Sequence, residues 1–149
     1  MLQEFLGLPL MEMGKLALKL ILSVVLGGLI GFEREKAHKP AGLRTNILVC
    51  LGTTVFMIIA VEIFKAYPGS PVDVTRVAAG IITGIGFLGA GTILRTSRDI
   101  QGLTSAATIW FVCGIGMATG MGFYVIAIMA ALLGFLILKG VVYFSKSFE

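Results

Sequence analysis

Charged residues that could bind an ion or a partner gather in two short bends of the chain. These bends carry seven such groups: Glu33, Arg34, Glu35, Arg44, Arg95, Arg98 and Asp99. Carboxylates supply the oxygen ligands that Mg²⁺ prefers. Glu33 and Glu35 are therefore the candidate Mg²⁺ ligands of a charged network between the bends. The alternative is that these charges end helices and lie in water among lipid headgroups.

A glycine-rich stretch, GIGFLGAG from Gly84 to Gly91, is the second candidate site. On a helix, Arg76, Gly80 and Gly91 fall on one stripe, and small residues there let another helix approach closely. The alternative is a broken helix that presents backbone carbonyls to an ion. The glycines predicted to pack helices or to line an ion path are Gly27, Gly31, Gly80, Gly84, Gly86, Gly89 and Gly91.

The remaining polar residues have simpler interpretations. Asp73 precedes Arg76 by three positions, which predicts a capped helix start with an ion pair. Thr45, Thr104 and Thr108 are expected to bond back to the backbone, as membrane threonines commonly do. Trp110 lies within an apolar run, and we expect it to be packed.

Catalytic patterns are missing from the sequence. His38 is its single histidine, and neither Cys50 nor Cys113 has a partner at metal-ligand spacing. The GxGxxG that begins at Gly84 lies inside an apolar run, whereas a dinucleotide site requires a preceding strand. We therefore expect neither an enzyme nor a bound cofactor. The absence of a basic stripe with interleaved aromatic residues also argues against nucleic-acid binding.

The elements that position these residues are membrane-spanning helices. Hydrophobic residues make up 57% of the 149 residues and charged residues 13%, whereas soluble domains carry about 25% charged residues. The sequence predicts an all-α membrane protein, a single transmembrane domain over 1–149 with five spans. Their expected ranges are 16–32, 43–64, 74–94, 103–119 and 123–144. The first span is expected to be retained, because no basic region precedes it.

Lysine and arginine counts predict the orientation of these spans. One side carries eight of them: Arg34, Lys36, Lys39, Arg44, Arg95, Arg98, Lys139 and Lys146. The other carries four: Lys15, Lys19, Lys65 and Arg76. Cytoplasmic loops are enriched in these residues, so we predict an external N-terminus and a cytoplasmic C-terminus. Arg76 and Arg95 lie near the two ends of the third span and are 19 residues apart, roughly 28 Å of helix, which is close to the thickness of the hydrocarbon core.

Residues 16–64 and 74–119 form a possible parallel repeat. Gly42-Leu43 aligns with Gly102-Leu103 at an offset of 60, and Cys50 aligns with Cys113 at an offset of 63. Both halves then contain a glycine-rich helix, a charged bend and a second helix. A repeat of this kind places the two charged bends on the same side of the membrane.

The sequence resembles the MgtC/SapB family of bacterial inner-membrane proteins. The resemblance rests on three blocks, which are LGGLIGFERE (26–35), AGLRT (41–45), and RVAA (76–79) continued by GIGFLGAG (84–91), GLTSAA (102–107) and Trp110. Gly80 stands where the family often has glutamine, and Ser105 replaces a usual threonine. The namesake members continue into a cytoplasmic ACT-like domain, whereas this sequence stops at Glu149.

The resemblance implies a multi-pass protein of the bacterial inner membrane, linked to magnesium limitation, acid stress or virulence. Two functions follow as hypotheses. The first is a regulator that binds another membrane protein through its glycine-rich helix faces and forms homo-oligomers, with a dimer favoured. The second is a transporter or channel for Mg²⁺, K⁺, H⁺ or a small solute. Ion paths usually require polar groups within the membrane, so the first is preferred.

Overall fold

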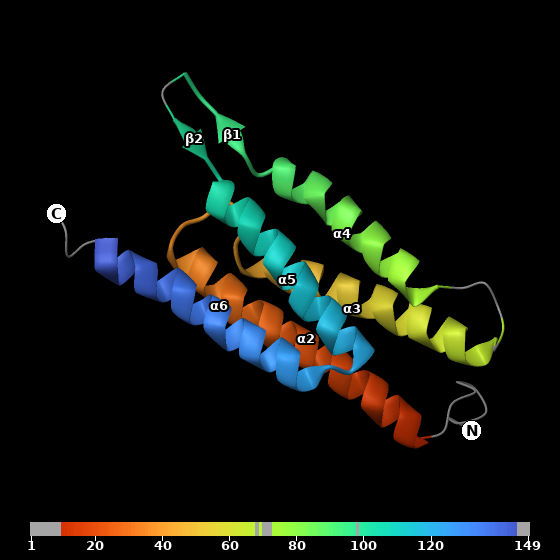
Figure 1. Ribbon diagram of the computed structural model, residues 1–149. Coiled ribbons are helices and arrows are strands. Elements are labelled where there is room, and N and C mark those ends of the chain that lie inside the picture. Colours follow the sequence, from red (N-terminus) through yellow and green to blue (C-terminus); the bar gives the residue numbers. More distant parts are fainter. Residues whose placement is uncertain (1–9, 68, 70–72, 98, 146–149) are drawn as a thin grey trace.

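The computed structural model describes residues 10–67, 69, 73–97 and 99–145. Within these residues the chain forms five helices and one short hairpin (Figure 1). The elements are α2 (Leu10–Lys36), α3 (Leu43–Ala66), α4 (Val74–Ala90), β1 (Leu94–Arg95), β2 (Ile100–Gln101), α5 (Leu103–Met121) and α6 (Tyr124–Ser145). The predicted all-α class is confirmed.

Three of these helices are long and apolar enough to cross a membrane. They are α2, α3 and α5. Helix α4 is shorter, with 17 residues, whereas α6 has 22. Because about 20 helical residues cross the hydrocarbon core, α4 meets the requirement less fully than the longer helices.

The third helix is shorter than the sequence predicted, and this part of the prediction was wrong. Helix α4 ends at Ala90 rather than at Leu94. The N–H groups of Thr92 and Ile93 turn back to the carbonyls of Gly89 and Ala90, at 3.0 and 3.1 Å. The chain then enters the antiparallel β1–β2 hairpin. Residues 84–90 remain helical, so the helix is not broken within the glycine-rich stretch.

The core lies between α2, α3 and α5, and α6 covers one side of it. Its fully buried side chains include Ile30, Cys50, Met57 and Val112. Helix α6 contributes Ala127, whereas α4 lies along α5 and α3 at the edge of the bundle (Figure 1). The α2–α3 bend, the hairpin and the C-terminal end of α6 lie at one end of the bundle, which we call the hairpin end.

Candidate functional site

The two charged bends meet at the hairpin end around a polar cavity. Its volume is about 600 Å³. The α2–α3 bend contributes His38, Lys39 and Pro40, and the other wall is formed by residues 100–105 of β2 and the start of α5. Helix α2 ends shortly before this cavity, where His38 adopts a left-handed conformation with φ of 53°. The parts of the chain that the sequence analysis expected to converge therefore lie together.

The charged side chains of the bends do not form one network within the described residues. Arg34 is buried, with 3% of its surface exposed, and its guanidinium donates to the carboxylate of Glu33. Arg44, Arg95 and Asp99 are exposed, with no ion pair to another described residue. Arg98 lies outside the described residues. Among the described residues, the predicted network amounts to one ion pair, between Glu33 and the buried Arg34, in which each charge offsets the desolvation of the other.

Both candidate Mg²⁺ ligands already have partners inside the chain. The carboxylate of Glu33 accepts from Arg34, and that of Glu35 accepts from the N–H of Leu43 at 2.9 Å. Among the described residues, no three His, Cys, Asp or Glu side chains form a group that could hold a metal ion. Both carboxylates therefore accept hydrogen bonds from the bend itself, and a Mg²⁺ site here stays a prediction.

Gly27 and Gly31 lie where α2 and α3 touch most closely. A Cβ atom added at Gly27 would lie 2.7 Å from the Cβ of Cys50 and 2.9 Å from the carbonyl oxygen of Asn46. A Cβ atom at Gly31 would lie 2.8 Å from the Cα of Leu43. Contacts this short leave no room for a side chain, so these two glycines set the distance between the helices.

The glycines of α4 face open space more than they face the bundle. A Cβ atom at Gly80, Gly84 or Gly86 would meet no atom of the described part of the chain outside α4 within 4 Å. Gly89 is the buried member, because its Cβ would lie 3.5 Å from the carbonyl oxygen of Ala106 in α5. Gly91 sits in the turn that ends the helix. Most of the predicted packing face of α4 is therefore available to something outside this chain.

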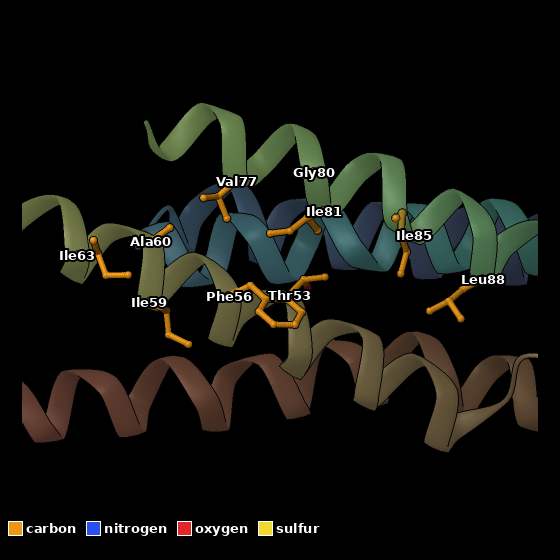
Figure 2. A pocket seen from close by; sticks show the side chains of 11 residues that line it. Thr53, Phe56, Ile59, Ala60, Ile63, Val77, Gly80, Ile81, Ile85 and Leu88 are labelled. Carbon is orange, nitrogen blue, oxygen red and sulfur yellow. The ribbon is translucent and has the colours of Figure 1, made fainter. Parts of the chain in front are cut away.

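An apolar groove runs between α3 and α4 on the surface of the bundle. Its volume is about 500 Å³, and Figure 2 shows side chains of both helices along it. Helix α3 contributes Phe56, among others, and α4 contributes Gly80, Ile81, Gly84 and Leu88. Phe56 is 57% and Leu88 53% exposed. The groove thus combines large exposed apolar side chains with glycines that leave the α4 backbone accessible.

Polar side chains inside the bundle are held by backbone carbonyls. Thr108 donates to the carbonyl of Thr104 at 2.7 Å, as the sequence predicted. Neither Thr45 nor Thr104 donates such a bond within the described residues, so the prediction was wrong for these two. Thr54 donates instead to another helix, at the carbonyl of Gly116, 2.8 Å away. The residue types gave no sign of that contact, because a threonine bonded to its own helix looks the same in the sequence.

Asn46 is a buried polar residue that was not among the predicted site residues. Its Nδ2 donates to the carbonyls of Ala41 and Gly42, at 2.9 and 2.7 Å. Its Oδ1 has no partner among the described residues. An asparagine in the first turn of a membrane helix is the signal that could have pointed to it. Its amide secures the bend that carries the cavity wall.

Lys19 is a second polar contact whose position the sequence does not reveal. Its Nζ donates to the carbonyl of Gly120 at 2.7 Å. Cations are favoured at helix C-termini, where carbonyls lack partners. Lys19 therefore joins α2 to the last turn of α5.

The opposite end of the bundle contains the predicted cap of α4. The carboxylate of Asp73 accepts from the N–H of Thr75 at 2.8 Å and from its hydroxyl at 2.7 Å. These hydrogen bonds, with smaller help from the charge of Arg76, lower the pKa of Asp73 below its ordinary value. The cap is confirmed, whereas the ion pair with Arg76 does not form within the described residues.

Trp110 does not pack inside the bundle, and this prediction was wrong. It is 57% exposed on α5. Its neighbours in the sequence, Ile109 and Val112, point into the core instead. One turn of a helix carries residues on all sides, so an apolar run alone does not show which of them face the core.

Comparison with known proteins identifies the family. The model of the MgtC family matches residues 20–147. The chain is 40% identical over 125 residues to "Putative magnesium transporter YhiD" of Escherichia coli strain K12, covering 82% of this chain and 58% of that protein. It is 42% identical over 116 residues to Protein MgtC of Salmonella typhimurium strain LT2, covering 78% and 48% respectively.

The chain thus spans about half the length of the curated relatives it matches. No solved structure matches it. The family match extends over both bends, the glycine-rich stretch, the larger part of α2 and the other four described helices. Together with three helices of membrane-spanning length and composition, it shows that this chain is a membrane protein that belongs to the MgtC family.

Proposed function

We propose that this chain is a multi-pass protein of the bacterial inner membrane that acts as a regulator by binding a transmembrane helix of another membrane protein. The α3–α4 groove is the observation that supports this proposal. The regulation is linked to magnesium limitation, acid stress or virulence, which are the settings implied by the family. The hairpin end, which carries most of the described Lys and Arg residues, faces the cytoplasm.

The groove has the properties that favour a helix in the bilayer. Lipid chains are as apolar as the groove, so burial of apolar surface does not by itself attract a partner there. Close backbone approach and tight packing supply the attraction instead. Gly80 and Gly84 permit that approach, because no atom of the described residues outside α4 lies within 4 Å of a Cβ placed at either position. Phe56 and Leu88 flank this space and can pack against the incoming helix.

Transport of a cation is the second candidate, and the name of the Escherichia coli relative is the observation in its favour. The interior of the bundle offers it less support. Thr53, Thr108 and Thr119 are buried, and each donates to a carbonyl of its own helix. The polar cavity lies at the hairpin end rather than at mid-depth. A flux assay with the purified chain in liposomes, loaded with a Mg²⁺-sensitive dye, tests this candidate directly.

Photo-crosslinking in living cells tests the regulator. A photoreactive amino acid replaces Phe56 in the groove or Leu133 on α6, since both side chains are 57% exposed. We expect a discrete protein adduct from position 56 and none from position 133. Gly84→Leu fills the groove and should abolish the adduct. Gly114→Leu is the matched control, because Gly114 also faces open space but lies outside the groove.

The adduct is then identified by mass spectrometry, with two differently tagged copies of the chain expressed together. A different membrane protein that crosslinks in a Gly84-dependent manner supports the proposal. An adduct between the two tagged copies would show that the groove serves a homodimer and would overturn the proposal. Adducts of equal yield from positions 56 and 133, or adducts that survive Gly84→Leu, would also overturn it.

A further inference from the structure

The first turn of α5 presents backbone donors that have no acceptor among the described residues. The N–H of Ala106 donates to the carbonyl of Gly102 at 2.8 Å and begins the hydrogen bonding of the helix. The N–H groups of Leu103, Thr104 and Ser105 precede it. Gly102 occupies the capping position with φ of 88° and has no side chain with which to cap them. These donors lie at the positive end of a 19-residue helix.

The hydroxyl of Ser105 is a further donor at the same place. Ser105 is 1% exposed, and it lines the polar cavity at the hairpin end. It makes no hydrogen bond within the described part of the chain, unlike Thr108 one turn later, which donates to Thr104. An acceptor inside the cavity would take the hydrogen bond that this hydroxyl can donate.

The opposite wall of the cavity adds the positive charge of Lys39. His38 and Lys39 line this wall and are exposed. Their backbone is fixed, because the N–H of His38 donates to the carbonyl of Glu35 and that of Lys39 to the carbonyl of Arg34, both at 3.0 Å. No Asp or Glu is among the described residues that line the cavity. Donors and positive charge therefore face a space without an acid.

The N-terminus of α3 also follows a glycine cap, and there the chain itself supplies an acceptor for a free N–H group. Gly42 caps α3 and likewise provides no side-chain hydrogen bond. There the carboxylate of Glu35 reaches across the bend and accepts from the N–H of Leu43 at 2.9 Å. At the repeat offset of 60, the residue that corresponds to Glu35 is Arg95. The chain supplies an anion to the start of α3 and a cation near the start of α5.

We propose that the cavity at the start of α5 binds a phosphate group, held by the N–H groups of residues 103–105, the hydroxyl of Ser105 and the side chain of Lys39. Helix N-termini bind phosphate because free N–H groups and the helix dipole act together. The volume of about 600 Å³ accommodates the group together with bound water. Its source is inorganic phosphate or the headgroup of an anionic lipid, and the chemistry of recognition is the same for both. This site is independent of the α3–α4 groove.

Amide chemical shifts of the full chain test the proposal. The protein, labelled with ¹⁵N, is purified in dodecyl maltoside, which contains no phosphate, and is titrated with inorganic phosphate or with phosphatidylglycerol. We expect the amides of residues 103–105 to shift in a saturable manner. Ser105→Ala should weaken binding about tenfold, because it removes a hydrogen bond to a charged group. Lys39→Gln should weaken it about threefold, and Lys139→Gln, the matched control at the same end, should not.

The two arms identify the source of the phosphate. Saturation by inorganic phosphate alone indicates a free anion, whereas saturation by phosphatidylglycerol that then blocks inorganic phosphate indicates a lipid headgroup. Either result supports the site. Amides that do not shift with either probe would overturn the proposal. Binding that is equally strong in Ser105→Ala, Lys39→Gln and the unaltered chain would also overturn it, and Lys39→Gln alters only an exposed side chain and leaves the fold intact.

Discussion

The carboxylate of Glu35 accepts a hydrogen bond from the backbone N–H of Leu43, 2.9 Å away across the α2–α3 bend. The last turn of one helix thereby caps the first turn of the next. Gly42 is what permits this contact, because a Cβ atom at that position would overlap the Glu35 carboxylate. The bend thus depends on a pair of residues, an acid that supplies the acceptor and a glycine that leaves room for it.

Replacement of Glu35 should loosen the start of α3. We expect Glu35→Ala to lower the free energy of unfolding by about 1 kcal/mol, the usual cost of a lost helix cap. Hydrogen exchange at the amide of Leu43 should become faster and report the loss locally. Glu35→Gln keeps an acceptor and should change both quantities less. Equal effects of the two substitutions would show that the charge of Glu35, rather than its hydrogen bond, holds the bend.

The glycines of α2 and α4 should respond in opposite ways to the same substitution. Gly27→Ala places a methyl group 2.7 Å from the Cβ of Cys50, and overpacking of this kind costs about 1–3 kcal/mol. Gly80→Ala meets nothing within 4 Å and should stabilise the chain by about 1 kcal/mol, because alanine favours the helix. Unfolding in mixed detergent micelles measures both. Loss of stability in Gly80→Ala would contradict the open face of α4.

The cap of α4 predicts a dependence on pH. Because hydrogen bonds from Thr75 lower the pKa of Asp73 below its ordinary value of 3.8, the folded state favours the ionised carboxylate. The stability that this cap contributes is complete above the ordinary pKa, and it is lost as the pH falls through the lowered pKa.

Thermal unfolding measured between pH 6 and 3 therefore tests the role of Asp73. The unaltered chain should lose stability below about pH 4, and Asp73→Asn, which retains an acceptor that does not titrate, should lose less over the same interval. Parallel curves for the two proteins would mean that other carboxylates govern the response to acid.

The orientation of the chain can be tested by labelling of single cysteines. Lys39→Cys lies at the hairpin end, and Lys65→Cys lies on the exposed last turn of α3 at the other end. Cys50 and Cys113 are buried and are replaced by alanine. If the hairpin end faces the cytoplasm, a membrane-impermeant maleimide should label position 65 in intact spheroplasts and position 39 only after the membrane is opened. The reverse pattern would contradict the orientation expected from Lys and Arg counts.

Hydropathy and glycine spacing were sufficient to predict much of this fold. The five apolar segments became the five described helices, because each one is long enough to satisfy its own backbone. The pair Gly27 and Gly31 was recognisable because the spacing of four places both on one helix face. The Asp73 cap was equally local, since all of its partners lie within three residues. Features that depend on short separations were therefore accessible from the sequence.

The remaining features depend on which helix lies beside which. The Lys19 contact joins residues 101 positions apart, and the Thr54 contact joins residues 62 apart. In both contacts the acceptor is a backbone carbonyl. Because every residue has such a carbonyl, residue type does not reveal the partner. The hairpin was missed for a different reason, since Leu94 extends the hydrophobic run before it and Ile100 lies alone between the polar residues Asp99 and Gln101. Charge alone also overstated the network at the bends, because Glu33 and Glu35 bond to their nearest available donors.

The short length of helix α4 affects how this protein fits a bilayer. If α4 crosses the membrane as predicted, its 17 residues span about 26 Å, less than a hydrocarbon core of about 30 Å, so the surrounding lipid would thin or the flanking residues would extend toward the interface. Helix α4 packs at the edge of the bundle against α3 and α5, so it can adjust its tilt while the core between α2, α3 and α5 stays fixed. The width of the α3–α4 groove should then follow membrane thickness, which would make partner binding sensitive to lipid chain length.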